Sequence, residues 1–325
     1  MAGNESGKAQ VILDLDTGID DAMAIAYVLG SPDAELVGIT CTYGNVEVGR
    51  SVRNSLALTE LLGHPEVPVY RGLGHALASD GFEVLPSTLR IHGANGMGEV
   101  EVPEPMREAD PTPAADLIVR AAHELGPRLV YVPTGPLTNL AAALRRDPEV
   151  ARLIGRVVLM GGALTQPGNV SACAEANVSQ DPEAADEVFR SGMRVTMVGL
   201  DVTHQTLLTR EETARWRALG TAAGRAYADM VDYYIGAYAE SAPQLGGCAL
   251  HDPLAAAVAL DPSLVRTLPI NLKVDLAGPT RGRTIGDETR LNDPEKTCAV
   301  ALGVDSERFL GIFMERMGRA LGAGD

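Results

Sequence analysis

Residues 11–24 read VILDLDTGIDDAMA, a short apolar run that passes through a glycine-containing turn into a stretch with helical spacing. This strand, turn and helix pattern is typical of the start of a βαβ unit. The same stretch holds four carboxylates within eight residues, namely Asp14, Asp16, Asp20 and Asp21. It therefore predicts the first strand of a sheet and the first polar groups of a site.

Similar apolar runs recur along the chain, separated by stretches with helical periodicity. The predicted strands are residues 11–13, 36–42, 67–70, 129–132, 157–160, 195–200 and 270–274, and the predicted helices are residues 20–29, 48–62, 114–125, 137–146, 182–190 and 224–240. This alternation predicts an α/β fold with a doubly wound, mainly parallel sheet and helices on both faces. Thr112 before Pro113 is the expected N-cap of one helix.

No linker or internal repeat divides the chain, so we expect a polar tail at residues 1–10 followed by a single catalytic domain at residues 11–325. Residues 72–111 and 276–294 are expected to form long loops. The second of these contains the sequence GPTRGR at residues 278–283.

The composition excludes several classes of protein. The 325 residues are 46% hydrophobic and carry 43 acidic against 27 basic side chains, a net charge of −16. This charge argues against a nucleic-acid partner. The beginning of the sequence has neither a signal peptide nor a membrane span, so we expect a cytoplasmic protein with no membrane partner. The four cysteines are widely spaced and predict neither a zinc site nor a disulfide framework.

The acidic stretch predicts a cation site. Asp20 and Asp21 at a helix start gain from the helix dipole. Asp14 and Asp16, however, would repel one another at a strand end without a compensating charge. A hard divalent cation such as Ca²⁺ or Mg²⁺ fits, because it takes oxygen ligands. Other polar residues also follow predicted strands, and the carboxyl ends of such strands share one edge of the sheet. Asp252 before Pro253 has an alternative explanation as a helix N-cap.

Several short motifs follow the acidic stretch in a fixed order. They are YGN at residues 43–45, IHG at 91–93, PTGPLTN at 133–139, MGG at 160–162, GLDVTH at 199–204 and HDP at 251–253, with Asn169, Glu175 and Asn177 between MGG and GLDVTH. Together with residues 14–21, these motifs resemble the inosine-uridine preferring nucleoside hydrolase family. The resemblance runs from about residue 11 to the carboxyl-terminal region.

This resemblance implies calcium-dependent hydrolysis of the N-glycosidic bond of ribonucleosides, giving free base and ribose, with a role in purine or pyrimidine salvage. It implies a Ca²⁺ site made by Asp16, Asp21, the main-chain carbonyl of Thr134 and Asp252. Asp14 would orient the turn behind them. The residues implied to hold the substrate are Asp20, Asn45, His92, Met160, Asn169, Glu175 and Asn177. A homodimer or homotetramer is also implied.

The chemistry of the reaction assigns roles to two of these residues. Cleaving a ribosyl C–N bond passes through an oxocarbenium-like transition state, so the enzyme must activate water and protonate the departing base. Asp16 is the expected base. His251 is the expected acid, as a group that can carry charge near neutral pH, and His92 or a tyrosine is the alternative.

The aromatic residues indicate which nucleobases the enzyme is expected to accept. Tyr234 and Tyr238 are one helical turn apart and either line a base pocket or pack in the core. The single tryptophan, Trp216, is expected in the core. Without a tryptophan clamp, we expect a broad or pyrimidine-tolerant enzyme.

Two other functions remain open at this point. A strand followed by Asp14 and Asp16 is also found in Mg²⁺-dependent haloacid dehalogenase-type phosphatases, but Gly18 stands where these have Thr or Val. A non-catalytic nucleoside- or ribose-binding protein is the second alternative. Asp16 and His251 argue against it, because binding alone needs neither a base nor an acid.

Overall fold

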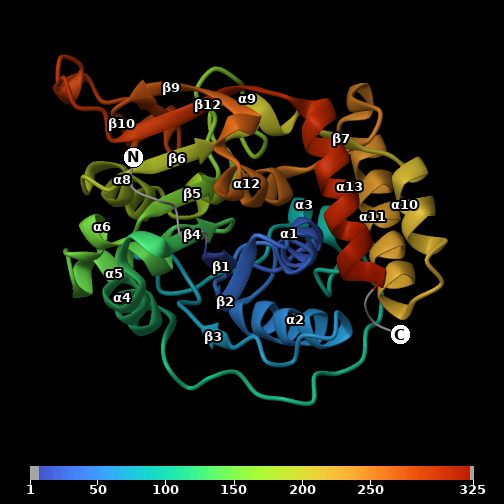
Figure 1. Ribbon diagram of the computed structural model, residues 1–325. Helices are drawn as coiled ribbons and strands as arrows, with labels where there is room; N and C mark the ends of the chain where they lie inside the picture. Colours follow the sequence, from blue (N-terminus) through green and yellow to red (C-terminus); the bar gives the residue numbers. More distant parts are fainter. Residues whose placement is uncertain (1–6, 323–325) are drawn as a thin grey trace.

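Eight strands form one sheet in the computed structural model, which describes residues 7–322 (Figure 1). Their order across the sheet is β3-β2-β1-β4-β5-β6-β12-β9, and only β9 runs antiparallel to its neighbour. The strands are β1 (Ala9–Leu15), β2 (Ala34–Cys41), β3 (Val69–Arg71), β4 (Leu129–Pro133), β5 (Arg156–Met160), β6 (Val195–Val198), β9 (Val265–Ile270) and β12 (Cys298–Val304). The predicted α/β fold with a mainly parallel sheet is confirmed.

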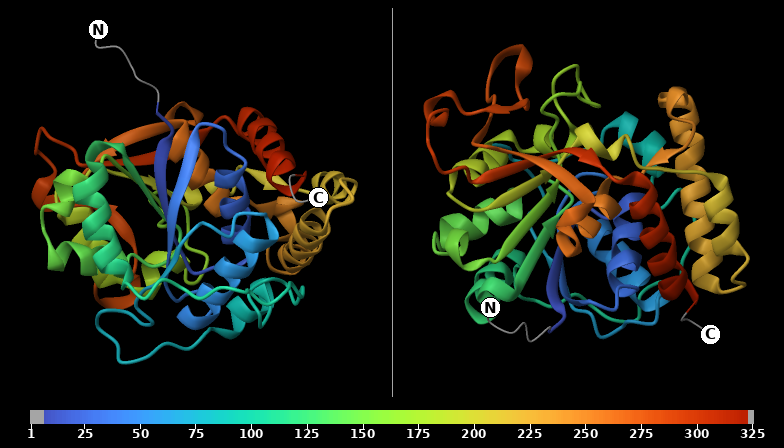
Figure 2. Two further views of the ribbon diagram at one scale, coloured as in Figure 1. Left: turned by 60° about the horizontal axis from the view of Figure 1, so that its bottom comes forward. Right: turned by 45° about the horizontal axis from the view of Figure 1, so that its top comes forward.

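Helices cover both faces of this sheet, as Figures 1 and 2 show. One face carries α1 (Ile19–Leu29), α2 (Val48–Leu61), α11 (Ala222–Ser241), α12 (His251–Leu260) and α13 (Ser306–Gly322), and the other carries α4 (Ala114–Leu125), α5 (Thr138–Arg146) and α8 (Pro182–Arg190). Residues of β1 alternate between the two cores: Val11 and Leu13 pack in the first, and Ile12 packs in the second. This period of two leaves the sheet buried on both sides.

The remaining elements are short. They are α3 (Pro86–His92), α6 (Val150–Leu153), α7 (Ala176–Gln180), α9 (Leu200–Thr203), α10 (Arg210–Arg217), and two two-stranded antiparallel sheets, β7 (Leu207–Leu208) with β8 (Cys248–Ala249) and β10 (Leu272–Val274) with β11 (Thr284–Gly286). Both long loops therefore contain local structure: α3 lies within residues 72–111 and β11 within residues 276–294. Trp216 of α10 is buried against Phe313 of α13, as expected for a core residue.

Some predicted boundaries were wrong. The predicted strand 195–200 ends at Val198 because α9 begins at Leu200, and the predicted strand 270–274 is divided between β9 and β10. The strand β12 and the helix α13 were not predicted. The apolar run of β12 fits a buried helix as well as a buried strand, and only its pairing with β6 and β9 decides between them.

Two predicted helix caps were also wrong. Pro113, with extended backbone, occupies the N-cap of α4, so Thr112 lies outside the helix. At α12 the N-cap is Leu250, and the helix begins at His251. Asp252 therefore lies inside the first turn, and its buried carboxylate is available for another role.

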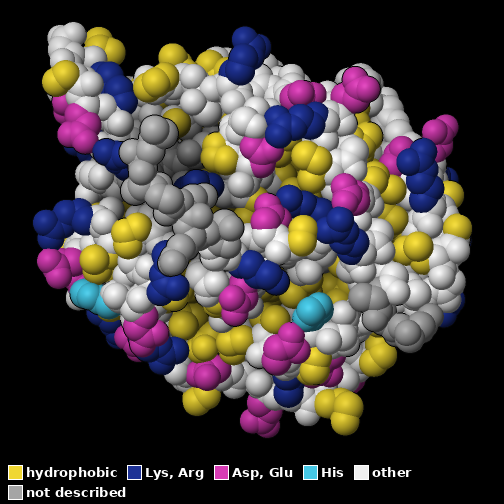
Figure 3. Space-filling view, in the orientation of Figure 1, with side chains coloured by type: hydrophobic (Ala, Val, Ile, Leu, Met, Phe, Trp, Pro, Cys, Tyr) yellow, Lys and Arg dark blue, Asp and Glu magenta, His cyan; other side chains and the backbone are white. Residues whose placement is uncertain are grey.

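Two further predictions concern the ends of the chain and its surface. β1 begins at Ala9, inside the predicted polar tail at residues 1–10, of which residues 1–6 lie outside the described part. Every helix within residues 7–322 is too short or too polar to cross a membrane. On the face shown in Figure 3, basic and acidic side chains are interspersed.

Candidate active site

A cavity of about 390 Å³ opens beyond the carboxyl ends of β1, β2, β4 and β5. This is the edge at which ligands bind in doubly wound sheets. Most of the predicted site residues line it, although they come from segments far apart in the sequence. Those residues are Asp20, Asn45, His92, Thr134, Met160, Asn169, Glu175, Asn177, Tyr234, Tyr238, His251 and Asp252.

Asp16 and Asp21 lie behind this lining and are fully buried. The backbone N–H of Asn45 donates to Oδ2 of Asp16 at 2.6 Å, and its side-chain amide donates to Oδ2 of Asp21 at 3.2 Å. The Thr134 hydroxyl donates to Oδ1 of Asp21 at 2.8 Å. Both carboxylates are therefore held by residues that face the cavity. A Cβ at Gly44 would collide with Oδ2 of Asp16, so this close approach requires glycine.

Asp21 also stabilises the beginning of α1, the helix in which it lies. Its Oδ2 accepts a hydrogen bond from the backbone N–H of Gly18 at 2.8 Å, which satisfies one of the free donors at the beginning of α1. The carboxylate thus has a structural function in addition to any ligand that it holds.

Three carboxylates converge closely enough to share a cation. Asp20, Asp21 and Asp252 each offer an oxygen within 4.8 Å of the other two, and all three residues are buried. Of the four predicted metal-binding residues, Asp21 and Asp252 belong to this cluster, and Asp20 joins them in place of Asp16. Thr134 contacts the cluster through its hydroxyl, and its carbonyl oxygen accepts a hydrogen bond from Nδ2 of Asn177 at 2.6 Å.

A nearby positive charge would stabilise the ionised form of these carboxylates. Burial raises the pKa of Asp20 and that of Asp21 to about 6. Burial, together with the charge of Asp21, raises the pKa of Asp16, and burial with the charge of Asp20 raises that of Asp252. Oδ1 of Asp16 and Oδ1 of Asp20 have no hydrogen-bond partner. Buried carboxylates with open oxygens fit a hard cation well.

Asp14 lies away from the cavity. Its Oδ1 accepts hydrogen bonds from the Thr40 hydroxyl at 2.7 Å and from the Asn139 amide at 2.8 Å. Asn139 in turn accepts a hydrogen bond from the backbone N–H of Leu73 at 2.9 Å. Asp14 therefore joins the ends of β1 and β2 to the start of the loop at residue 72. Asn139 belongs to a motif of the sequence, but its own contacts could not be foreseen from that motif.

Glu175 and Asn177 build one wall of the cavity. The Glu175 carboxylate accepts backbone hydrogen bonds from Gly162 at 2.8 Å, from Asn177 at 2.9 Å and from Val178 at 3.1 Å, and so caps α7. The Asn177 amide donates to the carbonyl of Met160 at 3.2 Å. These contacts tie α7 to the ends of β4 and β5.

The two histidines of the cavity are held differently. Nε2 of His251 lies 2.6 Å from the Tyr238 hydroxyl, and its Nδ1 lies 2.8 Å from the Thr203 hydroxyl. Nδ1 of His92 accepts a hydrogen bond from the backbone N–H of Ile19 at 3.3 Å. Sequence reasoning gave Thr203 no role, because only the fold brings α9 against α12.

Burial lowers the pKa of His251 to about 3 and that of His92 to about 4. Both rings are therefore neutral at pH 7, which differs from the expectation of an acid that is charged near neutral pH. Tyr234 and Tyr238 form an edge-to-face pair with ring centroids 4.9 Å apart. Both line the cavity next to these histidines.

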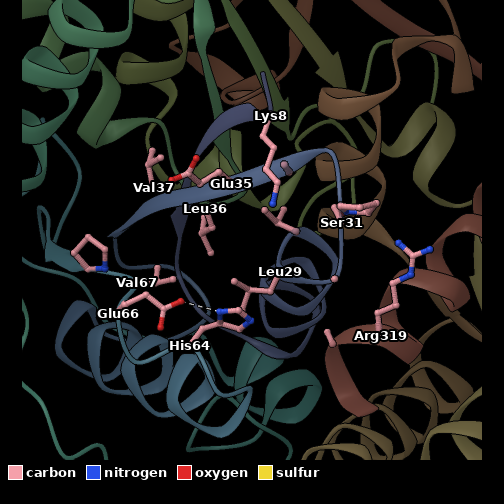
Figure 4. A pocket seen from close by; sticks show the side chains of 16 residues that line it. Lys8, Leu29, Ser31, Glu35, Leu36, Val37, His64, Glu66, Val67 and Arg319 are labelled. Carbon is pink, nitrogen blue, oxygen red and sulfur yellow. Dashed lines mark hydrogen bonds and ion pairs between the residues drawn. The ribbon is translucent and has the colours of Figure 1, made fainter. Parts of the chain in front are cut away.

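A larger hollow of about 690 Å³ lies at the opposite, amino-terminal edge of β2 and β3 (Figure 4). Its wall is partly apolar, and it includes His64, whose Nδ1 lies 2.9 Å from the Glu66 carboxylate. Within residues 7–322, the only other group of possible metal ligands is His123, Asp147 and Glu149, which lies at the surface. The convergence of buried carboxylates therefore distinguishes the smaller cavity as the candidate site.

Known proteins of one family are similar to this chain over nearly its whole length. The family model described as inosine-uridine preferring nucleoside hydrolase matches residues 11–311. An inosine-uridine preferring nucleoside hydrolase from Crithidia fasciculata is 35% identical over 313 residues, which cover 95% of this chain and 98% of that protein. The pyrimidine-specific ribonucleoside hydrolase RihA from Citrobacter koseri is 35% identical over 308 residues, which cover 94% of this chain and 97% of that protein.

Solved structures agree with this family. A purine-preferring ribonucleoside hydrolase from Gardnerella vaginalis matches with a TM-score of 0.96 and 62% identity, and the match covers 97% of this chain and 99% of that one. A plant nucleoside hydrolase matches with a TM-score of 0.89 and 33% identity, over 96% of this chain and 99% of that one. The resemblance seen in the sequence motifs is confirmed.

The buried carboxyl of Asp14 predicts a pH dependence of stability. Burial raises its pKa from 3.8 to about 6. The folded state therefore binds this proton more tightly than the unfolded chain, and folding stability falls as the pH rises from about 4 to about 6. In Asp14→Asn the free energy of unfolding should fall less over this interval, by up to about 3 kcal/mol.

Urea denaturation at several pH values, in the presence of a chelator, measures this difference. Asp80→Asn, which changes an exposed carboxylate, is the control and should leave the pH profile unchanged. Parallel profiles for Asp14→Asn and the unchanged protein would show that Asp14 is ionised in both states.

Proposed function

Because the chain belongs to the inosine-uridine preferring nucleoside hydrolase family, and is therefore a nucleoside N-ribohydrolase, we propose that it hydrolyses purine ribonucleosides in a calcium-dependent reaction. The observation that carries the proposal is the set of buried carboxylates, with open oxygens, at the base of the cavity. The single catalytic domain at residues 11–325, the cytoplasmic location, the salvage role and the homodimer or homotetramer remain predictions.

Purine preference replaces the broad or pyrimidine-tolerant preference expected from the sequence. Its support is the 62% identity, over 97% of the chain, with the purine-preferring enzyme from Gardnerella vaginalis. The pyrimidine-specific RihA is 35% identical. The paired rings of Tyr234 and Tyr238 offer aromatic surface on which a nucleobase can pack.

The donor set favours Ca²⁺ or Mg²⁺, since all the candidate ligands are oxygens, and the family resemblance selects calcium. Asp21, Asp252, Asp16 and the Thr134 carbonyl would hold the ion, with Asp20 close enough to join them. When bound, the ion supplies the positive charge that lets these carboxylates stay ionised and orients oxygen ligands. The predicted ribose contacts are Asp20, Asn45, His92, Met160, Asn169, Glu175 and Asn177, all of which line the cavity.

Asp16 is the base in this proposal. Its Oδ2 is fixed by the backbone of Asn45, which leaves Oδ1 free to accept a proton from the attacking water. Burial raises the pKa of Asp16, so it is a better proton acceptor than an exposed aspartate. The carboxylates of Asp20 and Glu175 would also stabilise positive charge on the ribosyl group in the transition state.

Protonation of the departing base is assigned to His251 and Tyr238 together. The 2.6 Å separation of Nε2 and the Tyr238 hydroxyl allows a proton to pass between them. Thr203 holds the other ring nitrogen and so orients the imidazole. The pair is neutral before the step. It gives one proton to the departing base and is left with one negative charge, which a proton from solvent neutralises after the base has left.

The alternative functions lack comparable support. In a haloacid dehalogenase-type phosphatase, Asp14 or Asp16 would have to reach a phosphate. Asp14 is instead bonded to Thr40 and Asn139, away from the cavity. A protein that only binds nucleosides is excluded by the membership of a hydrolase family.

A substrate panel tests the central proposal. Inosine, adenosine and guanosine should release ribose with a higher kcat/KM than uridine and cytidine, as measured by a reducing-sugar assay. 2′-Deoxyinosine should be poorer by up to ~10⁴-fold, because a missing hydroxyl leaves buried polar groups unpaired. Binding of inosine without release of ribose would contradict the enzyme assignment, and preferred cleavage of uridine would contradict purine preference.

Metal removal tests the cation site. A strong chelator should abolish ribose release, and Ca²⁺ should restore it. Independently of activity, Ca²⁺ at ~100 times its Kd should raise the free energy of unfolding of the metal-free protein by about 3 kcal/mol. Asp252→Asn should lose this stabilisation in thermal unfolding.

His123→Ala, which disrupts the exposed group His123, Asp147 and Glu149, is the matched control and should keep the response to Ca²⁺. If His123→Ala loses the response to Ca²⁺ and Asp252→Asn keeps it, the cation binds at the exposed group and not in the cavity. Full activity in the metal-free protein would refute calcium dependence.

Leaving-group dependence tests the acid. His251→Ala should lose ~10²–10⁴-fold in kcat on inosine, a magnitude typical of general acids. The loss on nitrophenyl riboside should be far smaller, because nitrophenolate departs without a proton. Equal losses on both substrates would mean that His251 positions Asp252, and His92 or Tyr238 would then be the remaining candidates for the acid.

A further inference from the structure

One wall of the cavity is a loop whose middle part makes few hydrogen bonds to the rest of the protein. Residues 162–175 connect β5 to α7, and Gly168, Asn169 and Val170 near the middle of this loop line the cavity. Asn169 and Val170 are largely exposed to solvent. The position of this segment determines whether Asn169 can meet a substrate.

Both ends of the loop are fastened to the protein body. At one end, the Asp201 carboxylate accepts hydrogen bonds from the backbone of Leu164 at 2.9 Å and of Thr165 at 2.6 Å. The Thr284 hydroxyl bonds to Ala163. At the other end, the carboxylate of Glu175 bonds to Gly162 and to the start of α7. Between these ends, residues 166–174 bond mainly to one another.

Arg283 reaches into this interior. Its Nη1 donates to the carbonyl of Gln166 at 2.8 Å and to that of Cys173 at 3.2 Å, and its Nη2 donates to the carbonyl of Leu164 at 2.8 Å. Among the hydrogen bonds of residues 7–322, those from Arg283 are the ones that link residues 166–174 to a distant part of the chain. One guanidinium thus joins the outgoing and returning halves of the loop.

The backbone of Arg283 is held in place by the pairing of β10 with β11. It directly precedes β11, which pairs with β10, and its backbone bonds to Asp275 and Thr280 at 2.9 Å each. The side chain is half-buried, so its hydrogen bonds to carbonyls are partly shielded from water. The planar guanidinium can donate several hydrogen bonds in a fixed geometry, which a lysine cannot reproduce.

We propose that Arg283 is a positioning residue for substrate binding, which holds the 162–175 loop so that Asn169 and Glu175 face the ribose of the nucleoside. The inference rests on the proposed function. It gives a role to the GPTRGR sequence at residues 278–283. Arg283 touches neither the substrate nor the reacting atoms in this proposal, and it acts through the loop.

The same sequence supplies a matched control. Arg281, two residues earlier, is exposed and bonds to the Glu183 carboxylate and to the carbonyl of Leu276. It makes no hydrogen bond to residues 162–175. Arg281→Gln and Arg283→Gln therefore remove the same charge from one hairpin, but only the second removes the contacts to the loop.

The kinetic test separates binding from chemistry. If the loop is ordered in only a tenth of the molecules of Arg283→Gln, the KM for inosine should rise ~10-fold, while kcat changes by less than ~3-fold. Product inhibition by ribose should weaken by the same factor as KM rises. Arg281→Gln should match the unchanged protein, and Arg283→Lys should restore part of the affinity.

A second test reports on the loop without activity. Cys173 lies within the loop and is partly accessible, whereas Cys41, Cys248 and Cys298 are buried. Labelling of the native protein by an aromatic disulfide reagent such as dithionitrobenzoate should therefore be faster in Arg283→Gln than in Arg281→Gln. Peptide mapping should place the label on Cys173.

The outcomes distinguish the two proposals. Equal labelling rates in the two variants would overturn the claim that Arg283 holds the loop. Faster labelling with an unchanged KM would overturn its role in substrate binding, and so would a loss confined to kcat. Failure of the proposed function would instead appear as no release of ribose from any nucleoside by the unchanged protein, a result on which the labelling rates do not depend.

Discussion

The mutual repulsion of buried carboxylates is the constraint on which the rest of the site depends. Asp16, Asp20 and Asp21 arise from one turn after β1, and the first turn of α12 adds Asp252. Burial raises the pKa of each of them, so the free energy of the folded protein carries a cost that a shared cation would offset. The surrounding amide and hydroxyl donors hold these oxygens in place, and they do not neutralise them.

The parallel sheet makes this concentration of charge possible. Its strands end at one edge, so turns that are far apart in sequence meet there and the two apolar cores hold them in place. The same burial that strains the carboxylates keeps His92 and His251 neutral. A charged imidazole here would cost desolvation energy, and the neutral ring of His251 is instead held by its hydrogen bond with Tyr238.

The floor of the cavity is formed by the ends of strands and helices, whereas one wall is formed by a loop. The floor belongs to strand ends and helix starts, where backbone hydrogen bonds fix each carboxylate. Asp201, Thr284 and Glu175 hold the two ends of the wall at residues 162–175, and Arg283, more than a hundred residues away in the chain, donates hydrogen bonds to its interior. The floor and the wall are thus built from separate parts of the chain.

The sequence alone determined the α/β class, the family and about half of the residues that line the cavity, because alternating strands and helices and ordered short motifs are local patterns. It could not reveal that Asp20 joins Asp21 and Asp252, which partners hold Asp14 behind the site, or that burial leaves His251 uncharged. It also missed β12, α13 and the roles of Thr203 and Arg283. These features arise from contacts between distant segments, and the free energies of burial and pairing that decide them exist only once the chain has folded.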